Sequence, residues 1–199
     1  IILGDAGLNY YGDGRDLALK MIVSQLPLTF LCIHGNHEMR PEKIGTYVES
    51  MWRGGAVYME ASFPNLLFAK DGELFDLDGI RAIAIGGAYS VDKYYRLARG
   101  YRWFVDEQPT EEIRDRVEKR LDSVGWRIDA VLSHTCPLKY EPTEVFIKGV
   151  DQSTVDKSTE SGLDAIENKL RYSRWFCAHY HTEKQIDRLQ FLYHSIQEF

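Results

Sequence analysis

Short apolar runs alternate with polar segments along the chain, and four of these runs end directly at residues that can bind metal ions. The four runs are residues 1–3, 30–33, 130–132 and 175–177. Continuous apolar runs are typical of buried strands in an open α/β sheet, where ligands collect at the carboxyl ends of the strands. The pattern therefore predicts a mostly parallel sheet with a binding site along one edge.

Helices are predicted where apolar residues recur three or four positions apart and capping residues flank the segment. The clearest case begins at Thr110, which can cap a helix, continues with two glutamates that suit its amino end, and stops at Gly125. Helices are expected over residues 16–25, 41–52, 110–124 and 162–172.

The middle of the chain has a different pattern, with short apolar runs at 66–69, 73–77 and 80–85. Asp71-Gly72 and Asp78-Gly79 separate these runs, and Asp-Gly between apolar runs favours a β-hairpin. We therefore expect an antiparallel meander that belongs to a second sheet.

Two further segments carry no regular pattern. Residues 93–103 mix cationic and aromatic side chains, and residues 140–161 are polar and aperiodic, which predicts a long loop or lid. Further strands are expected at 174–178 and 189–193.

Composition places the chain among globular proteins of one domain, which we expect to cover residues 1–199. Its 199 residues are 44% hydrophobic and 27% charged, with a net charge of -6. The negative charge argues against broad affinity for nucleic acid or anionic membranes, although it allows a local basic patch. No apolar stretch approaches the ~20 residues that span a bilayer. Three cysteines without C-x-x-C spacing indicate no disulfide framework, so the cytoplasm is the expected location.

Two polar segments near the amino end are the first candidates for a metal site. Asp5 follows a strand and could bridge two cations about 3.5–4 Å apart, although a turn aspartate is the simpler explanation. In Gly35-Asn36-His37-Glu38, Asn36 offers a neutral oxygen ligand, and His37 can donate a proton near neutral pH. A polar turn before a helix is the alternative for this segment, and we favour the functional interpretation.

Three histidines near strand ends complete the candidate set. His134 alone would usually be a partly buried structural residue. His179 and His181 are two apart, so in an extended segment both imidazoles would point to one site. Imidazole together with carboxylate and amide oxygens suits manganese, iron or zinc. The alternative for the last two is a surface pair on an edge strand.

These motifs, in this order, resemble the successive motifs of the calcineurin-like metallophosphoesterases, and the match covers the chain almost end to end. They are Gly4-Asp5, Gly35-Asn36-His37-Glu38, His134 and Ala178-His179-Tyr180-His181. Gly86-Gly87-Ala88, Ser90, Asp92 and Arg96 also resemble a bacterial and phage branch of that superfamily. The resemblance implies a four-layer α/β/β/α sandwich with two mixed sheets.

The resemblance also implies roles for individual residues. Asp5 would bridge two metal ions, with manganese expected first and iron or zinc as alternatives. Asn36, His134 and His179 would bind one ion and His181 the other. His37 would be the general acid, and Asp92 with Arg96 would contact the substrate.

Three features of the chain depart from the family pattern, and the mildest is Ala178 in place of the glycine of the usual Gly-His-x-His motif. The family begins with an Asp-x-His motif on its first strand, and nothing in this sequence matches it. We therefore expect that an amino-terminal βα unit of about thirty residues is missing. Phosphoprotein phosphatases carry an aspartate three residues after the bridging one, but Leu8 stands there. This argues against that branch and leaves Asn9 or water to orient His37.

The expected activity is hydrolysis of a phosphate ester by a dinuclear centre that generates a bridging hydroxide. The substrate would be a phosphorylated small molecule or nucleotide. Nucleic acid is an alternative, because the cationic and aromatic residues of 93–103 could grip phosphates and stack bases. The competing explanation is that those aromatic side chains pack on the core. A catalytically inactive protein-interaction scaffold of the same fold is the other alternative, and the oligomeric state stays open.

Overall fold

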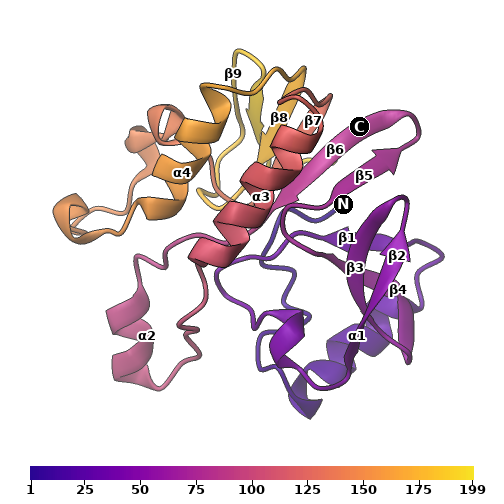
Figure 1. Ribbon diagram of the computed structural model, residues 1–199. Helices are drawn as coiled ribbons and strands as arrows, with labels where there is room; N and C mark the ends of the chain where they lie inside the picture. Colours follow the sequence, from indigo (N-terminus) through magenta and orange to yellow (C-terminus); the bar gives the residue numbers. More distant parts are fainter.

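The computed structural model describes residues 1–199 as two mixed β-sheets with helices packed against them (Figure 1). The smaller sheet has the strand order β1-β4-β3-β2, and the larger has the order β5-β6-β7-β8-β10-β9. The strands of the smaller sheet are β1 (Phe30–Cys32), β2 (Tyr47–Trp52), β3 (Gly55–Glu60) and β4 (Phe63–Ala69). The strands of the larger sheet are β5 (Leu74–Leu77), β6 (Ile80–Ile85), β7 (Ala130–Ser133), β8 (Arg174–Cys177), β9 (Lys184–Ile186) and β10 (Leu189–Phe191).

Strands β6, β7, β8 and β10 are parallel, and the antiparallel β5 and β9 close the two edges of the larger sheet. In the smaller sheet β1 pairs with β4 in parallel, and β4, β3 and β2 form an antiparallel meander. Ile2 forms a parallel bridge with Cys32. The ends of the apolar runs that begin at residues 1 and 30 therefore lie side by side.

An apolar core fills the space between the two sheets. It joins side chains of β1, β3 and β4 to side chains of β5, β6, β7 and β8, among them Leu31, Leu67, Ala84, Leu132 and Phe176. A second core lies on the other face of the larger sheet, where the helices α3 (Glu111–Ser123) and α4 (Ser158–Glu167) cover it. The expected α/β class with two mixed sheets is confirmed.

Helix α3 follows from its local sequence. Thr110 caps it by accepting a hydrogen bond from the Ile113 N–H at 3.4 Å. Ile113, Val117 and Leu121 lie four residues apart, so they share one face of the helix, and all three are buried. The helix expected over 110–124 is confirmed.

Helix α1 (Leu17–Ser24) is also confirmed, but its contacts with the small sheet are unusual. Its one buried residue is Lys20, whose ammonium lies 2.5 Å from the carboxylate of Glu60. Met21 and Ile22 are 56% and 66% exposed. The apolar periodicity therefore predicted the helix correctly, although most of its apolar side chains face outward.

The helix expected over 41–52 is wrong. Pro41–Lys43 form a single 3-10 turn, and Tyr47–Trp52 form β2, which pairs residue by residue with β3. A hairpin turn at Arg53-Gly54, with both residues at positive φ, joins the two strands. The ladder of long-range hydrogen bonds outweighs a weak local helical preference here.

The two Asp-Gly turns have different outcomes. Asp78-Gly79 joins β5 to β6 in an antiparallel hairpin, as expected. Asp71-Gly72 does not form a hairpin, because β4 and β5 belong to different sheets. This turn carries the chain from one sheet to the other, and the Asp71 carboxylate is buried against Arg40 at 2.7 Å.

The remaining expectations are met approximately. Strands β8 and β10 confirm the runs at 174–178 and 189–193, and α4 starts four residues before the expected helix at 162. The short strand β9 and the helix α2 (Lys93–Arg99) were not expected.

Cys32, Cys136 and Cys177 are free and buried. None of the helices combines the length and apolar character that crossing a membrane requires.

Candidate metal centre

Asp5 lies where the first apolar run meets the edge of the sheets, and its backbone conformation is unusual. Gly4 and Asp5 have φ values of 99° and 52°, in the left-handed region. A Cβ on Gly4 would overlap the His134 ring, so only glycine fits there. The Asp5 carboxylate accepts a hydrogen bond from the His37 backbone N–H at 2.9 Å. The close approach of three chain segments thus fixes the position of this carboxylate.

The turn at residues 35–38 is held from both sides. A Cβ on Gly35 would collide with Asp5, and the Gly35 N–H donates to the Glu38 carboxylate at 2.8 Å. Glu38 is completely buried, and burial raises its pKa to about 8. These contacts place Asn36 and His37 beside Asp5.

His134 follows β7, and its ring has a defined hydrogen-bonding pattern. Its Nδ1 lies 2.6 Å from the Leu3 carbonyl oxygen, which can only accept, so Nδ1 carries the hydrogen. A neutral imidazole then has a lone pair on Nε2. That Nε2 atom lies 2.8 Å from the Asn36 Oδ1 and 3.5 Å from an Asp5 carboxylate oxygen.

A second chain of hydrogen bonds fixes the orientation of the Asn36 amide. Its Nδ2 donates to the Ser90 hydroxyl at 2.8 Å, and that hydroxyl donates to the Glu107 carboxylate at 2.5 Å. The Ser90 backbone N–H donates to the same carboxylate at 3.1 Å. The Ser90 hydroxyl has one proton and donates it to Glu107, so it can only accept a hydrogen bond from Asn36. The Asn36 amide nitrogen therefore points to Ser90, and the Asn36 oxygen faces His134.

Three acceptor atoms consequently face one another with no hydrogen between them when His134 is neutral. Two ligands of one metal ion at bond lengths of about 2.1 Å lie roughly 3.0–3.4 Å apart. The separations of 2.8 and 3.5 Å are close to this range. The donor set of one imidazole, one amide oxygen and one carboxylate fits a divalent cation chemically.

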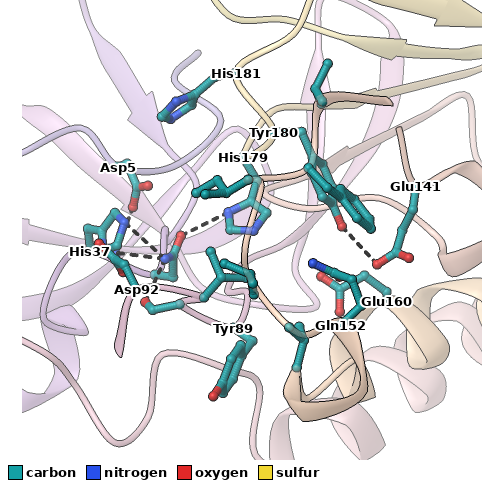
Figure 2. A pocket seen from close by; sticks show the side chains of 18 residues that line it. Asp5, His37, Tyr89, Asp92, Glu141, Gln152, Glu160, His179, Tyr180 and His181 are labelled. Atoms are coloured by element: carbon teal, nitrogen blue, oxygen red, sulfur yellow. Dashed lines mark hydrogen bonds between the residues drawn. The ribbon is translucent and has the colours of Figure 1, made fainter. Parts of the chain in front are cut away.

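His179 joins the same group of donors, whereas His181 stands apart. The His179 Nδ1 lies 3.2 Å from the Asn36 Oδ1, and burial lowers its pKa to about 3, so the ring is neutral. The His181 ring stacks on Tyr193, with ring centroids 4.6 Å apart. His181 lines the same cavity as Asp5 and His179 (Figure 2).

The extended geometry expected for these two histidines is wrong. Strand β8 ends at Cys177, and His179 and His181 have φ values of 63° and 50°. Left-handed backbone is uncommon outside glycine and concentrates at functional sites. The turn, rather than strand alternation, directs both rings towards the cavity.

No three His, Cys, Asp or Glu side chains lie close enough together to hold a metal ion by themselves. The candidate set therefore depends on the Asn36 amide oxygen, which is the atom that approaches both His134 and His179.

The charges of the site influence one another. Burial acts to raise the pKa of Asp5, but His134 and His37 outweigh it and leave that pKa below its ordinary value. Burial lowers the pKa of His37, which Asp5 opposes. His37 lines the cavity beside the donor group (Figure 2).

The two expected substrate contacts lie at different places. Asp92 lines the cavity, and one of its carboxylate oxygens is buried without a hydrogen-bond partner. Arg96 does not line the cavity; its guanidinium donates to the other Asp92 oxygen at 2.8 Å. Arg96 therefore contacts a residue of the cavity wall and does not reach the cavity itself.

Two other segments near the site, around Asn9 and over residues 93–103, differ from expectation. The Asn9 side chain accepts a hydrogen bond from the Tyr47 hydroxyl at 2.9 Å, and its amide nitrogen has no hydrogen-bond partner, so no hydrogen bond joins it to His37. Packing on the core was one explanation for the aromatic side chains of residues 93–103. Three of them do not pack there, since Tyr94, Tyr95 and Tyr101 are 71%, 55% and 52% exposed.

Sequence reasoning did not find two residues that shape the site. Glu107 anchors Ser90 from an irregular segment, where no periodicity or motif marks it. Glu160 lines the cavity from α4 and is buried. The sequence indicated this wall of the cavity only through the polar, aperiodic segment 140–161. A long loop was expected there, and the segment forms one wall of the cavity.

No model of a known protein family matches this sequence, and a search of curated proteins gives no match either.

Proposed function

We propose that the chain is a metal-dependent phosphoesterase of the calcineurin-like type, with the four-layer α/β/β/α arrangement of that superfamily. The observation that carries the proposal is the meeting of lone pairs from Asp5, Asn36 and His134 in a buried place where each is held by separate hydrogen bonds. Buried acceptors that face one another are unfavourable unless a proton or a cation lies between them.

Asp5, Asn36, His134 and His179 would hold one divalent cation, and His181 with the second Asp5 oxygen would contribute to another. Manganese is the first candidate, with iron or zinc as alternatives. Bound cations would supply Lewis-acid polarisation of the phosphoryl group and lower the pKa of a water molecule. Leu3 and Ser90 would keep the ligand atoms oriented, as outer-shell partners of metal sites do.

His37 would donate a proton to the departing ester oxygen or stabilise its charge. Its backbone N–H donates to Asp5, its ring lines the cavity, and its Nε2 atom lies 3.3 Å from the Asn36 amide nitrogen. Asp92 lies close enough to influence the His37 charge and favours its protonated form. Burial outweighs these acidic neighbours and leaves the pKa of His37 below its ordinary value.

The test combines thermal unfolding with hydrolysis of p-nitrophenyl phosphate and bis-p-nitrophenyl phosphate. After EDTA treatment, added MnCl2 should raise the melting temperature, since a ligand that binds only the folded state stabilises it. Asn36→Ala and His134→Ala should lose this shift and all turnover. His37→Ala should keep the shift and lose turnover by about 10²–10⁴-fold. The exposed His194→Ala is the matched control.

Two results would contradict the proposal. One is a wild-type chain that no divalent cation stabilises and that cleaves neither ester, which is the outcome expected of an inactive interaction scaffold. The other is a His134→Ala variant with wild-type turnover.

A nucleic-acid phosphodiesterase is a second candidate within the same chemistry. The exposed Tyr94, Tyr95 and Tyr101 support it, together with Lys93 and Arg99, whose charges lie over aromatic rings. Such surfaces stack bases and contact phosphates. Binding to a single-stranded oligonucleotide should then weaken steeply with salt, and salt-independent or absent binding would remove this candidate.

A further inference from the structure

The donor group forms only one side of a cavity of about 340 Å³. Figure 2 shows Asp5, His37 and Asp92 on one side, and Glu141, Gln152 and Glu160 on the opposite side. This volume is at the small end of the range for ligand pockets, and it matches a small molecule better than a polymer.

The wall away from the donor group is largely apolar. It is built from the loop between β7 and α4, and its apolar side chains are Val145, Phe146, Ile147, Val150 and Val155. Apolar side chains do not bind cations, so the candidate metal centre does not explain this wall. A phosphoryl group also has no apolar surface to bury, so the wall points to the organic part of an ester.

The loop is fixed in place rather than free. The Phe146 ring stacks on Tyr180, with centroids 6.0 Å apart and planes 19° apart. Lys157 binds the Glu141 carboxylate at 2.6 Å, and the Tyr180 hydroxyl donates to the same carboxylate at 3.2 Å. The apolar wall therefore exists before any ligand arrives, which lowers the entropic cost of binding.

Glu160 adds a polar group to this chamber. The side chain is 3% exposed, and one oxygen accepts from the Thr135 hydroxyl at 2.8 Å. The other oxygen, Oε2, is buried and has no hydrogen-bond partner. Buried polar atoms nearly always have partners, so an unpartnered one at a cavity wall marks the place of a ligand donor.

We propose that the cavity binds the planar aromatic group of a small phosphate ester and that Glu160 Oε2 accepts a hydrogen bond from that group. Rings favour such a site because they stack on aromatic walls and bury large apolar faces. The required group is nucleobase-sized and carries an N–H donor. This inference rests on the proposed phosphoesterase function for the identity of the ester, but the chamber can be tested without any reaction.

The first experiment measures binding of nucleosides, which carry no phosphate, to the metal-free full chain by calorimetry and saturation-transfer NMR. The probes are adenosine, guanosine and cytidine, each with an exocyclic amine, and purine riboside, which lacks one. At least one amino nucleoside should bind about tenfold more tightly than purine riboside, as expected when a ligand donor satisfies a buried acceptor. Glu160→Gln should reduce that ratio to near one.

The second variant blocks the chamber. Val145 is 40% exposed at the wall, so Val145→Trp should fold and lower nucleoside affinity at least tenfold. Val105→Trp is the matched control, because Val105 is 86% exposed and lies outside the cavity. Thermal melts confirm folding of all three variants.

Absence of nucleoside binding, or binding that neither Glu160→Gln nor Val145→Trp changes, overturns the inference. With metal restored, hydrolysis of adenosine monophosphate should have a KM at least tenfold below that of glycerol 2-phosphate. If the enzyme hydrolyses both esters with equal KM values, the inference about the aromatic group is overturned and the proposed phosphoesterase function stands. Nucleoside binding without hydrolysis of any ester would instead contradict the proposed function and leave the chamber assigned.

Discussion

Ser90→Ala is the most informative perturbation, because Ser90 connects the candidate ligand Asn36 to its anchor Glu107. The three side chains are almost completely buried, at 1%, 1% and 2% exposure for Ser90, Asn36 and Glu107. Alanine removes the acceptor of the Asn36 amide and the hydroxyl donor to Glu107. The Asn36 amide then has no fixed orientation.

The magnitude follows from the two groups that lose their partners. Each unsatisfied buried polar group costs about 1–3 kcal/mol, so the free energy of unfolding should fall by about 2–6 kcal/mol. Loss of an outer-shell partner usually weakens metal binding about 10–100-fold, which corresponds to about 1.4–2.7 kcal/mol. Burial raises the pKa of Glu107 and the Ser90 hydrogen bonds lower it, so the variant should also protonate Glu107 at higher pH.

The assay pairs urea unfolding of the metal-free protein with calorimetric titration of MnCl2. Thr159→Ala is the matched control, because the Thr159 hydroxyl is buried and donates to Gln108 at 2.8 Å, away from the donor group. The control should lose stability and keep its manganese affinity. A Ser90→Ala variant that binds manganese as tightly as wild type would refute the reasoning.

Three further predictions concern stability. Glu60→Gln should cost about 3 kcal/mol in urea unfolding, because Lys20 stays buried without its partner. Burial raises the pKa of Glu160 to about 7 from its ordinary 4.5, so the wild type should lose up to about 3 kcal/mol of stability between pH 4.5 and 7, as the unfolded state releases its proton first. Glu160→Gln removes this titration and should gain stability relative to wild type over that pH range. Gly35→Ala should unfold several degrees lower in a thermal melt, because the added Cβ has no space.

Each of these has a control. Glu49→Gln removes an ion pair to Lys70 that is largely exposed, so a loss as large as that of Glu60→Gln would show that burial is not the cause. Gly45→Ala adds a Cβ that meets no atom within 4 Å, and it should leave the melt nearly unchanged. A Glu160→Gln difference that is constant with pH would mean that Glu160 titrates normally in the folded chain.

Local sequence determined a substantial part of this protein. Apolar runs located β1, β7 and β8, and the Thr110 cap with its periodic apolar stripe located α3. These features depend on neighbours a few residues apart. The sequence motifs also named Asp5, Asn36, His134 and His179, which lie together in the structure.

Other features were decided only by contacts between distant segments. The pairing of β2 with β3 replaced an expected helix, and the left-handed turn at His179 replaced the extended segment expected for the two histidines. The anchoring of Asn36 through Ser90 to Glu107 joins residues 71 positions apart, and no local pattern signals it. Hydrogen-bond partners and buried faces are chosen by the whole packed chain, whereas a sequence window reports only the preference of each segment taken alone.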